Sequence, residues 1–368
     1  MLTRCSATDL LQSLVGIPSQ SGDEAAAATW LADWMSANGF EAGVDDAGNA
    51  VGRRGRGLNH IALLGHIDTF PGDLPVRQEA DWLYGRGAVD AKGPLCAFAA
   101  AAALVEVAPD WQISVVGAVQ EECATSQGAR HLLASWPAPS CCVIGEPGGW
   151  QRITLGYKGR LLADVRWTAP LAHSAGMARL PAEQAVDAWN AVAAHCDAFN
   201  ADRPAGFDRL EPSLRHIATR DQGAYGAVEL SMGFRLPLGV APAEVADAVR
   251  GVVAETLASR GATAAESPVA QMAFSGHEVA FRADKNTRLV RAFLKGIREQ
   301  GGQPKFVAKS GTSDMNVVGP GWSVPILAYG PGDSALDHTP AERINLAEYW
   351  QAIEVLVSAL NAMQETIT

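Results

Sequence analysis

Gly65-His66-Ile67-Asp68-Thr69 closes the apolar run Ile61-Ala62-Leu63-Leu64, and the interpretation of the whole sequence starts there. The run has the length and the flanking turn residues of a buried β-strand. His66 and Asp68 lie two positions apart, so they share one face of an extended chain. At a strand end, His66 could bind a metal ion while Asp68 orients it by hydrogen bonding. Taken alone, H-x-D is more typical of a satisfied core histidine beside a capping aspartate, so a metal site depends on residues downstream.

The composition indicates an ordinary soluble globular protein, because 48% of the 368 residues are apolar and 19% are charged. This length predicts two domains, or one large core with an insertion. The net charge of −11 disfavours nucleic acid as a partner. No apolar stretch approaches the roughly 18 residues that span a membrane, and the N-terminus lacks a secretory h-region. Six cysteines without C-x-x-C spacing predict reduced thiols and a cytoplasmic location.

Strands alternating with helices in the first part of the chain predict an α/β fold, with a mostly parallel sheet covered by helices on both faces. From about Gly159 the order becomes β-α-β-β-α-β, which predicts an inserted α+β domain. The expected domains are 1–158 and 274–368 for the two catalytic segments, and 159–273 for the insertion. The predicted helices cover 23–38, 94–107, 127–135, 181–199, 242–259, 284–300 and 346–362. Thr8/Asp9 and Ser126 are the expected caps of an N-terminal helix and of helix 127–135.

Acidic residues follow the predicted strands downstream of His66. Asp90 precedes a helix, the pair Glu121-Glu122 follows one strand, and Glu146 follows the next. A second histidine, His338, lies in the C-terminal segment. In open α/β sheets, the carboxyl ends of the strands meet at one ligand crevice. Singly, Asp90 and Glu146 are typical helix caps. Together, two histidines and three carboxylates suit two zinc-class ions with one bridging carboxylate.

Five strings in this order, G-H-I-D-T, G-R-G-A-V-D-A-K-G, Q-E-E, G-E-P and D-H-T-P, resemble the co-catalytic zinc aminoacylase/carboxypeptidase family. This family includes acetylornithine deacetylase, succinyl-diaminopimelate desuccinylase and glutamate carboxypeptidase. The resemblance covers nearly the whole chain. It implies that the inserted domain is a lid that forms a homodimer.

The resemblance also implies the roles of individual residues. One Zn²⁺ (or Co²⁺) would be held by His66, Asp90 and Glu146, and the second by Asp90, Glu122 and His338. Asp68 would orient His66, Glu121 would be the general base, and the peptide bond Asp90–Ala91 would be cis. An extended backbone sends the side chains of Glu121 and Glu122 apart, which leaves Glu121 able to move a proton.

Further candidate residues lie in and after the inserted domain. The resemblance places His173 near the partner subunit's site, where it would stabilise an oxyanion as a catalytic residue; a surface loop histidine is the alternative. Arg235 falls on the polar face of its strand and could bind a substrate carboxylate, or could simply be exposed. Gly311, Thr312 and Gly332 lie in loops that could approach a substrate, and each loop could also be only a turn.

Three longer strings are most similar to carrier-protein lysine/ornithine hydrolases: Pro71–Pro75, Gly156–Arg160 and Lys309–Asn316. The predicted function is therefore hydrolysis of the amide bond of an N-acyl amino acid, as a deacetylase or a carrier-protein hydrolase of lysine or arginine biosynthesis. The partner is a small N-acyl amino acid or an amino-group carrier conjugate. An acidic carrier would need a basic patch, for which Arg152, Lys158, Arg160, Arg179 and Lys309 are candidates. A zinc di- or carboxypeptidase and a catalytically inactive binding homologue are the alternatives.

Overall fold

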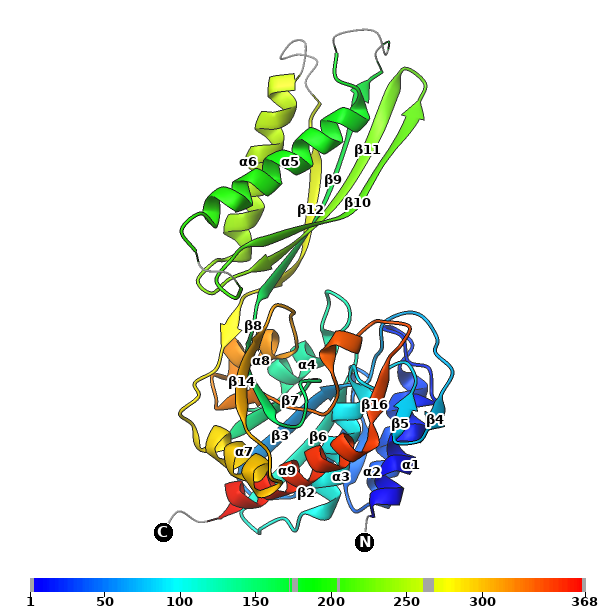
Figure 1. The fold of residues 1–368 in the computed structure, drawn as a ribbon, viewed down its shortest axis with the longest axis vertical. Helices are drawn as coiled ribbons and strands as arrows, with labels where there is room; N and C mark the ends of the chain where they lie inside the picture. Colours follow the sequence, from blue (N-terminus) through cyan, green and yellow to red (C-terminus); the bar gives the residue numbers. More distant parts are fainter. Residues whose placement is uncertain (1–2, 172, 174–177, 204–205, 261–267, 366–368) are drawn as a thin grey trace. The chain divides into compact units, whose positions relative to one another are not determined.

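The computed structural model describes residues 3–171, 173, 178–203, 206–260 and 268–365. The chain divides into two compact units (Figure 1). Unit 1 contains residues 1–156, 282–308 and 313–368, and unit 2 contains residues 157–281 and 309–312. Within the described ranges, no helix has the length and apolar character needed to cross a membrane.

Unit 1 is built on a large sheet with the strand order β1-β2-β6-β3-β7-β15-β8-β13, and β14 pairs with β8. Its four central strands, β6, β3, β7 and β15, are parallel. The pairs β1–β2, β2–β6 and β15–β8 are antiparallel. The strands are β1 Glu41–Val44, β2 Ala50–Gly55, β3 Asn59–His66, β6 Trp111–Ala118, β7 Cys141–Gly145, β8 Arg152–Tyr157, β13 Phe281–Arg282, β14 Lys305–Lys309 and β15 Ile326–Ala328. A small second sheet contains β4 Arg77–Glu79, β5 Trp82–Tyr84 and β16 Arg343–Asn345.

Helices cover both faces of the large sheet, as the sequence pattern predicts (Figure 1). Ile61 and Leu63 of β3 join one core with five helices, and Ala62 and Leu64, which are also buried, alternate onto the other face. The five helices are α1 Arg4–Val15, α2 Ala25–Ala37, α3 Lys92–Leu104, α7 Arg288–Glu299 and α9 Leu346–Gln364. α4 (Gln127–Ser135) contacts α8 (Met315–Trp322) and β6.

Glycines let α3 approach the carboxyl end of the central strands. Gly65 of β3 is in register with Gly117 of β6 and Gly145 of β7. A Cβ on Gly65 or Gly117 would lie 3.1–3.2 Å from Leu95 of α3. A Cβ on Gly145 would lie 2.9 Å from the ring of Phe98, also in α3. Side chains here would push away the helix that directly follows Asp90.

Unit 2 has the predicted β-α-β-β-α-β order, with a four-stranded antiparallel sheet ordered β10-β11-β9-β12. Buried side chains alternate along β9 and pack against both helices. The elements are β9 Gly159–Pro170, α5 Pro181–Phe199, β10 Glu211–Gln222, β11 Tyr225–Leu236, α6 Pro242–Arg260 and β12 Gln271–Glu278.

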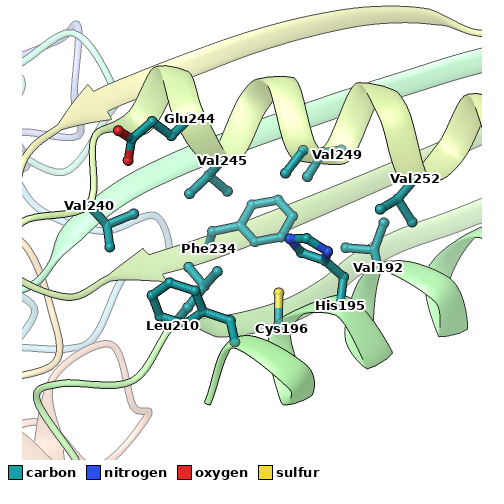
Figure 2. Close-up of a pocket in the computed structure, with 12 residues that line it drawn as sticks. Val192, His195, Cys196, Leu210, Phe234, Val240, Glu244, Val245, Val249 and Val252 are labelled. Carbon is teal, nitrogen blue, oxygen red and sulfur yellow. The ribbon is translucent and has the colours of Figure 1, made fainter. Parts of the chain in front are cut away.

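An apolar cavity of about 210 Å³ lies between α5, α6 and β11 (Figure 2). Phe234 of β11 and Val192 of α5 line it, and Val245, Val249 and Val252 line it from α6. Glu244 and His195 are the polar members of the lining. Both of these polar residues are exposed, so the cavity opens to solvent between the two helices.

One predicted helix cap is wrong, and the other is correct in position but makes no capping bond. The first helix begins at Arg4, and its cap is Thr3, whose side chain accepts the N–H of Ser6. Thr8 and Asp9 therefore lie inside that helix. Ser126 does precede α4, but it has a left-handed backbone (φ 39°) and its side chain makes no capping bond. Serine and threonine near a helix start are frequent enough that spacing alone did not identify the cap.

Candidate metal centre

The candidate ligands meet at one edge of the large sheet because of strand register. His66 is the last residue of β3 and pairs with Ala118, the last residue of β6. Glu121 and Glu122 follow β6 within four residues, and Glu146 follows β7 directly. Parallel strands thus deliver all four side chains to the same end of the sheet.

Asp90 lies between the two histidines. Its Oδ1 is 3.2 Å from Nε2 of His66, and its Oδ2 is 3.1 Å from Nε2 of His338. His338 also lies 3.0 Å from Oε1 of Glu122 through the same Nε2. The Asp90–Ala91 peptide bond is cis, which confirms the prediction. One carboxylate therefore faces two imidazoles with its two oxygens, the arrangement expected of a bridging ligand.

Two groups of side chains could each hold a metal ion. His66, Asp90 and Glu122 form one, and His66, Glu121 and Glu146 form the other, with the ligand atoms of each group within 4.8 Å of one another. Nitrogen and carboxylate donors in this number suit zinc-class ions. Glu146 is 8% exposed and His66 is 2% exposed, so the centre is largely shielded from water.

Burial and mutual repulsion shift the pKa values of the carboxylates at this centre. Burial raises the pKa of Glu121 well above its usual value, and the nearby carboxylates of Glu146, Asp314 and Glu122 raise it further against the opposing effect of His66. Burial also raises the pKa of Glu122. For Asp90, burial alone would raise the pKa, but His338 and His66 outweigh it and lower the pKa. Cations placed among these carboxylates would relieve the repulsion.

The pKa values of the two histidines at this centre are also raised. Hydrogen bonds to Asp90 and Glu122 raise the pKa of His338 to about 10. Burial would lower the pKa of His66, but Asp68 and Asp90 raise it well above its usual value. Nδ1 of His66 lies 3.0 Å from the carbonyl oxygen of Asp68, which can only accept, so Nδ1 is the donor of this contact. Nε2 is thereby directed toward Asp90.

Asp68 also organises the loop that carries the glutamate pair. Its carboxylate accepts the N–H of Glu121 on Oδ1 at 3.1 Å and the N–H of Glu122 on Oδ2 at 3.0 Å. The hydroxyl of Ser21 donates to the same Oδ2 at 2.7 Å. The two glutamates therefore lie in a loop after β6, not on an extended strand as predicted, because Gln120 turns the chain with φ 58°. Their carboxylates still separate into different candidate metal groups.

Several residues at the centre escaped the sequence interpretation. Glu342 is 1% exposed and accepts the backbone N–H groups of Val89 and Asp90. Glu24 accepts the N–H of Gln120 at 3.1 Å. The ring of Phe70 stacks on His338 with 4.2 Å between centroids. The only feature of the sequence that could have indicated a role for Glu342 is its position four residues after His338. This signal is weak, because a lone glutamate beside an arginine is usually exposed.

The predicted substrate-binding residues fall into both units. In unit 2, Nη1 of Arg235 donates to Oγ1 of Thr312 at 3.2 Å, so two of them lie together, with Gly311 adjacent in sequence. In unit 1, Gly332 has φ 103° and donates its N–H to Glu348. His173 is exposed, and the neighbouring positions 172 and 174–176 of its motif lie outside the described residues.

Three of the cations expected to form a basic patch are paired inside unit 2. Lys158 is fully buried, and its Nζ donates to Glu211 at 2.7 Å. Arg160 binds Glu278 at 3.0 Å. Arg179 likewise binds Asp187 at 2.9 Å. The expectation that Lys158 contributes to such a patch is therefore wrong, because its fully buried ammonium group needs an acidic partner of its own. Arg160 is 16% exposed and Arg179 is 38% exposed, and their contribution to a basic patch stays a prediction.

Comparison with known proteins gives consistent matches along the chain. The model of "Peptidase family M20/M25/M40" matches residues 62–362. A [LysW]-lysine hydrolase of Deinococcus radiodurans is 46% identical over 364 residues, covering 97% of each chain. A putative [LysW]-lysine/[LysW]-ornithine hydrolase of Thermococcus kodakarensis is 36% identical, covering 99% of this chain and 94% of the relative. A Bacillus subtilis protein described as a dinuclear metal binding peptidase of this family has the same fold, with a TM-score of 0.70, 12% identity and coverage of 98% and 99%.

Proposed function

This chain belongs to peptidase family M20/M25/M40, and from that premise we propose that it hydrolyses the amide that joins lysine or ornithine to an amino-group carrier protein. The resemblance inferred from the ordered motifs is confirmed, and the chain is a hydrolase of that family. The observation that carries the proposal is the contact of Asp90 with both His66 and His338, at the centre of a buried carboxylate cluster.

We assign two zinc-class ions, with Co²⁺ as a possible substitute for Zn²⁺, to this cluster. The donor chemistry fits, because the ligand atoms of His66, Asp90 and Glu122 lie within 4.8 Å of one another, as do those of His66, Glu121 and Glu146. Nε2 of His338 lies 3.1 Å from Asp90. His66, Asp90 and Glu146 would hold one ion, and Asp90, Glu122 and His338 the other. When bound, the ions would polarise the scissile carbonyl and lower the pKa of a water molecule.

Glu121 is proposed as the general base. Its side chain is 12% exposed, and burial together with neighbouring carboxylates raises the pKa of its carboxyl group. A carboxylate of raised pKa accepts the proton of the attacking water and returns it to the leaving amine more readily than an ordinary glutamate. Asp68 holds the amide of Glu121 and the ring of His66, which fixes both groups while the proton moves.

Further residues are proposed to act on the substrate. His173 would stabilise the oxyanion in the partner subunit of a homodimer. Arg235, positioned by Thr312, would bind the carboxylate of the released amino acid, with Gly311 and Gly332 approaching through their backbone. Strand β10 supports dimer formation, because it forms an edge of its sheet and exposes Leu214 and Ile217.

The substrate class follows from the relatives. Two of them are named for hydrolysis of [LysW]-lysine or [LysW]-ornithine, and the identities are 46% and 36% over nearly the full length. We therefore propose a carrier-bound amino acid in lysine or arginine biosynthesis, in preference to a free acetylated one. None of the six cysteines forms a disulfide, which supports the cytoplasm as the place of action.

A substrate panel with metal analysis tests the proposal. Purified protein is depleted with a chelator, reconstituted with Zn²⁺ or Co²⁺, and assayed on carrier-lysine and carrier-ornithine conjugates, acetyl-lysine, acetylornithine and dipeptides. We expect about two ions per chain and the highest kcat/KM on a carrier conjugate. Faster cleavage of dipeptides would favour a peptidase, and a protein that binds no zinc-class ion would overturn the proposal.

A further inference from the structure

We propose that Glu342 and Arg86 form a positioning pair that holds Asp90 and His338 in place for metal binding. The inference rests on the proposed metal centre and goes beyond it, because neither residue has a place among the metal ligands or the proton-transferring groups. Three sets of contacts support it: Glu342 with the backbone at Asp90, Glu342 with Arg86, and Arg86 with the residues beside His338.

Glu342 holds the backbone that presents Asp90. Its Oε1 accepts the N–H of Val89 at 3.0 Å and the N–H of Asp90 at 3.2 Å. The side chain of Glu342 is 1% exposed. Asp90 lies in the turn segment that precedes α3, so no helix or strand hydrogen bond holds its N–H. The carboxylate of Glu342 replaces those missing bonds and limits how far Asp90 can move.

Arg86 completes the pair on the other side of Glu342. Its Nη1 donates to Oε2 of Glu342 at 2.7 Å, and the guanidinium is 12% exposed. Its Nε donates to the carbonyl oxygen of Gly72 at 2.9 Å. The guanidinium thereby connects the 70–73 loop to Glu342, because its Nη1 binds Glu342 while its Nε binds Gly72.

The same guanidinium reaches His338 through an aromatic ring. Arg86 lies 5.9 Å from the centroid of the Phe70 ring, and Phe70 stacks on His338 at 4.2 Å with an interplanar angle of 12°. His338 has a left-handed backbone (φ 59°) and a side chain that is 41% exposed, so its own segment restrains it weakly. Phe70 supplies the missing restraint, and Arg86 holds the loop that carries Phe70.

Two features make this arrangement more than a stabilising ion pair. Glu342 follows His338 by four residues, so one short segment carries both a proposed ligand and the group that positions the other ligand. A buried ion pair also gains little net stability, because both charges lose their hydration. The geometry therefore points to a role in fixing the distance between Asp90 and His338, the two residues proposed to share the second ion.

The test compares variants of the pair with a matched pair outside the centre. Glu342→Gln keeps an acceptor for the two amides but loses the charge that faces Arg86. Arg86→Gln removes the contacts with Gly72 and Phe70. Glu342→Ala removes both the acceptor for the two backbone amides and the ion pair with Arg86. Glu79→Gln is the control, because Arg77 and Glu79 make an ion pair of the same length, 2.7 Å, at an exposed position in the small sheet. Calorimetric titration with Zn²⁺, Co²⁺ absorption spectra, kcat, KM and the melting temperature of the metal-free protein are measured for each.

We expect the second equivalent of Zn²⁺ to bind about 10–100-fold more weakly in Glu342→Gln and Arg86→Gln, with a shifted Co²⁺ spectrum, lower kcat and nearly unchanged KM. Glu79→Gln should match the wild type in every measurement. A lower melting temperature with wild-type metal affinity and spectrum would show a merely structural pair and overturn the inference. If the wild type itself binds fewer than two ions, the proposed metal centre fails before any variant is compared.

Discussion

Asp68 Oδ1 accepts a hydrogen bond from the backbone N–H of Glu121 at 3.1 Å, although the two residues follow different strands of the sheet. The same carboxylate lies 3.4 Å from Nδ1 of His66. One buried aspartate thus connects a proposed metal ligand to the proposed general base. Burial alone would raise the pKa of Asp68, but hydrogen bonds from His66, Ser21 and Glu122 outweigh it and lower the pKa. The group is ionised in the folded protein, as its acceptor role requires.

Replacing Asp68 should reduce turnover through geometry. Asp68→Ala leaves the amides of Glu121 and Glu122 without their acceptor and releases the ring of His66, so we expect kcat to fall about 10–100-fold. Steady-state kinetics with metal content measured on the same samples checks this. Ser21→Ala removes one contact to the same carboxylate and should have a much smaller effect. Equal losses in the two variants would contradict the role given to Asp68.

Glu121→Gln should separate proton transfer from metal binding. The amide cannot accept a proton, so we expect kcat to fall by at least about 100-fold while two ions remain bound. Glu122→Gln is the comparison, since it alters a proposed ligand of the second ion and should lower metal content as well. Metal analysis and single-turnover assays distinguish the variants. Substantial turnover by Glu121→Gln would show that another group is the base.

His60 should make the protein less stable in mild acid. Burial, aided by the charge of Arg53, lowers the pKa of His60 to about 4, whereas the unfolded chain titrates near 6.5. The unfolded state therefore binds more protons between these values, so the free energy of unfolding should decrease as pH falls from about 6.5 to 4, by up to about 3 kcal/mol. Denaturant unfolding at several pH values measures it. His60→Gln should flatten this dependence, and His216→Gln, at an exposed position, should leave it unchanged.

The cavity of unit 2 should accept additional apolar atoms. Val249 lines it and is 3% exposed, so Val249→Ile places one more methyl group inside and should raise the free energy of unfolding by about 0.5–1 kcal/mol. Val249→Ala enlarges the same cavity and should cost about 2 kcal/mol. Chemical denaturation of both variants tests this. A destabilising isoleucine would mean that the space is too narrow for the added group.

The sequence predicted the centre well where strand order decides the geometry. His66, Asp90, Glu122 and Glu146 could be assigned to one edge because each follows a predicted strand or precedes a predicted helix. His338 was assigned from the resemblance to the family. The family was predicted from five ordered motifs, and the α/β fold with an α+β insertion from the order of strands and helices. The assignment of ions and of proton transfer to these residues stays a prediction.

The features of the site that the sequence could not predict depend mainly on contacts between segments that are far apart in the chain. Glu342 and Glu24 reach backbone amides that no local pattern identifies, and Phe70 reaches His338 across the loop. The conformation of the glutamate pair depends on a single residue, Gln120, with a positive φ. Lys158 was expected to contribute to a basic patch, but its side chain is buried and pairs with Glu211.

The contact of His338 with Asp90 also has a consequence for the synthesis of this protein on the ribosome. His66, Asp90, Glu122 and Glu146 emerge from the ribosome early, and His338 only after all of unit 2 and most of the chain have been made. A growing chain therefore carries most of the acidic cluster but lacks the histidine that completes it. On the proposed roles, the nascent chain would be unable to complete the metal centre until the segment that contains His338 has been made.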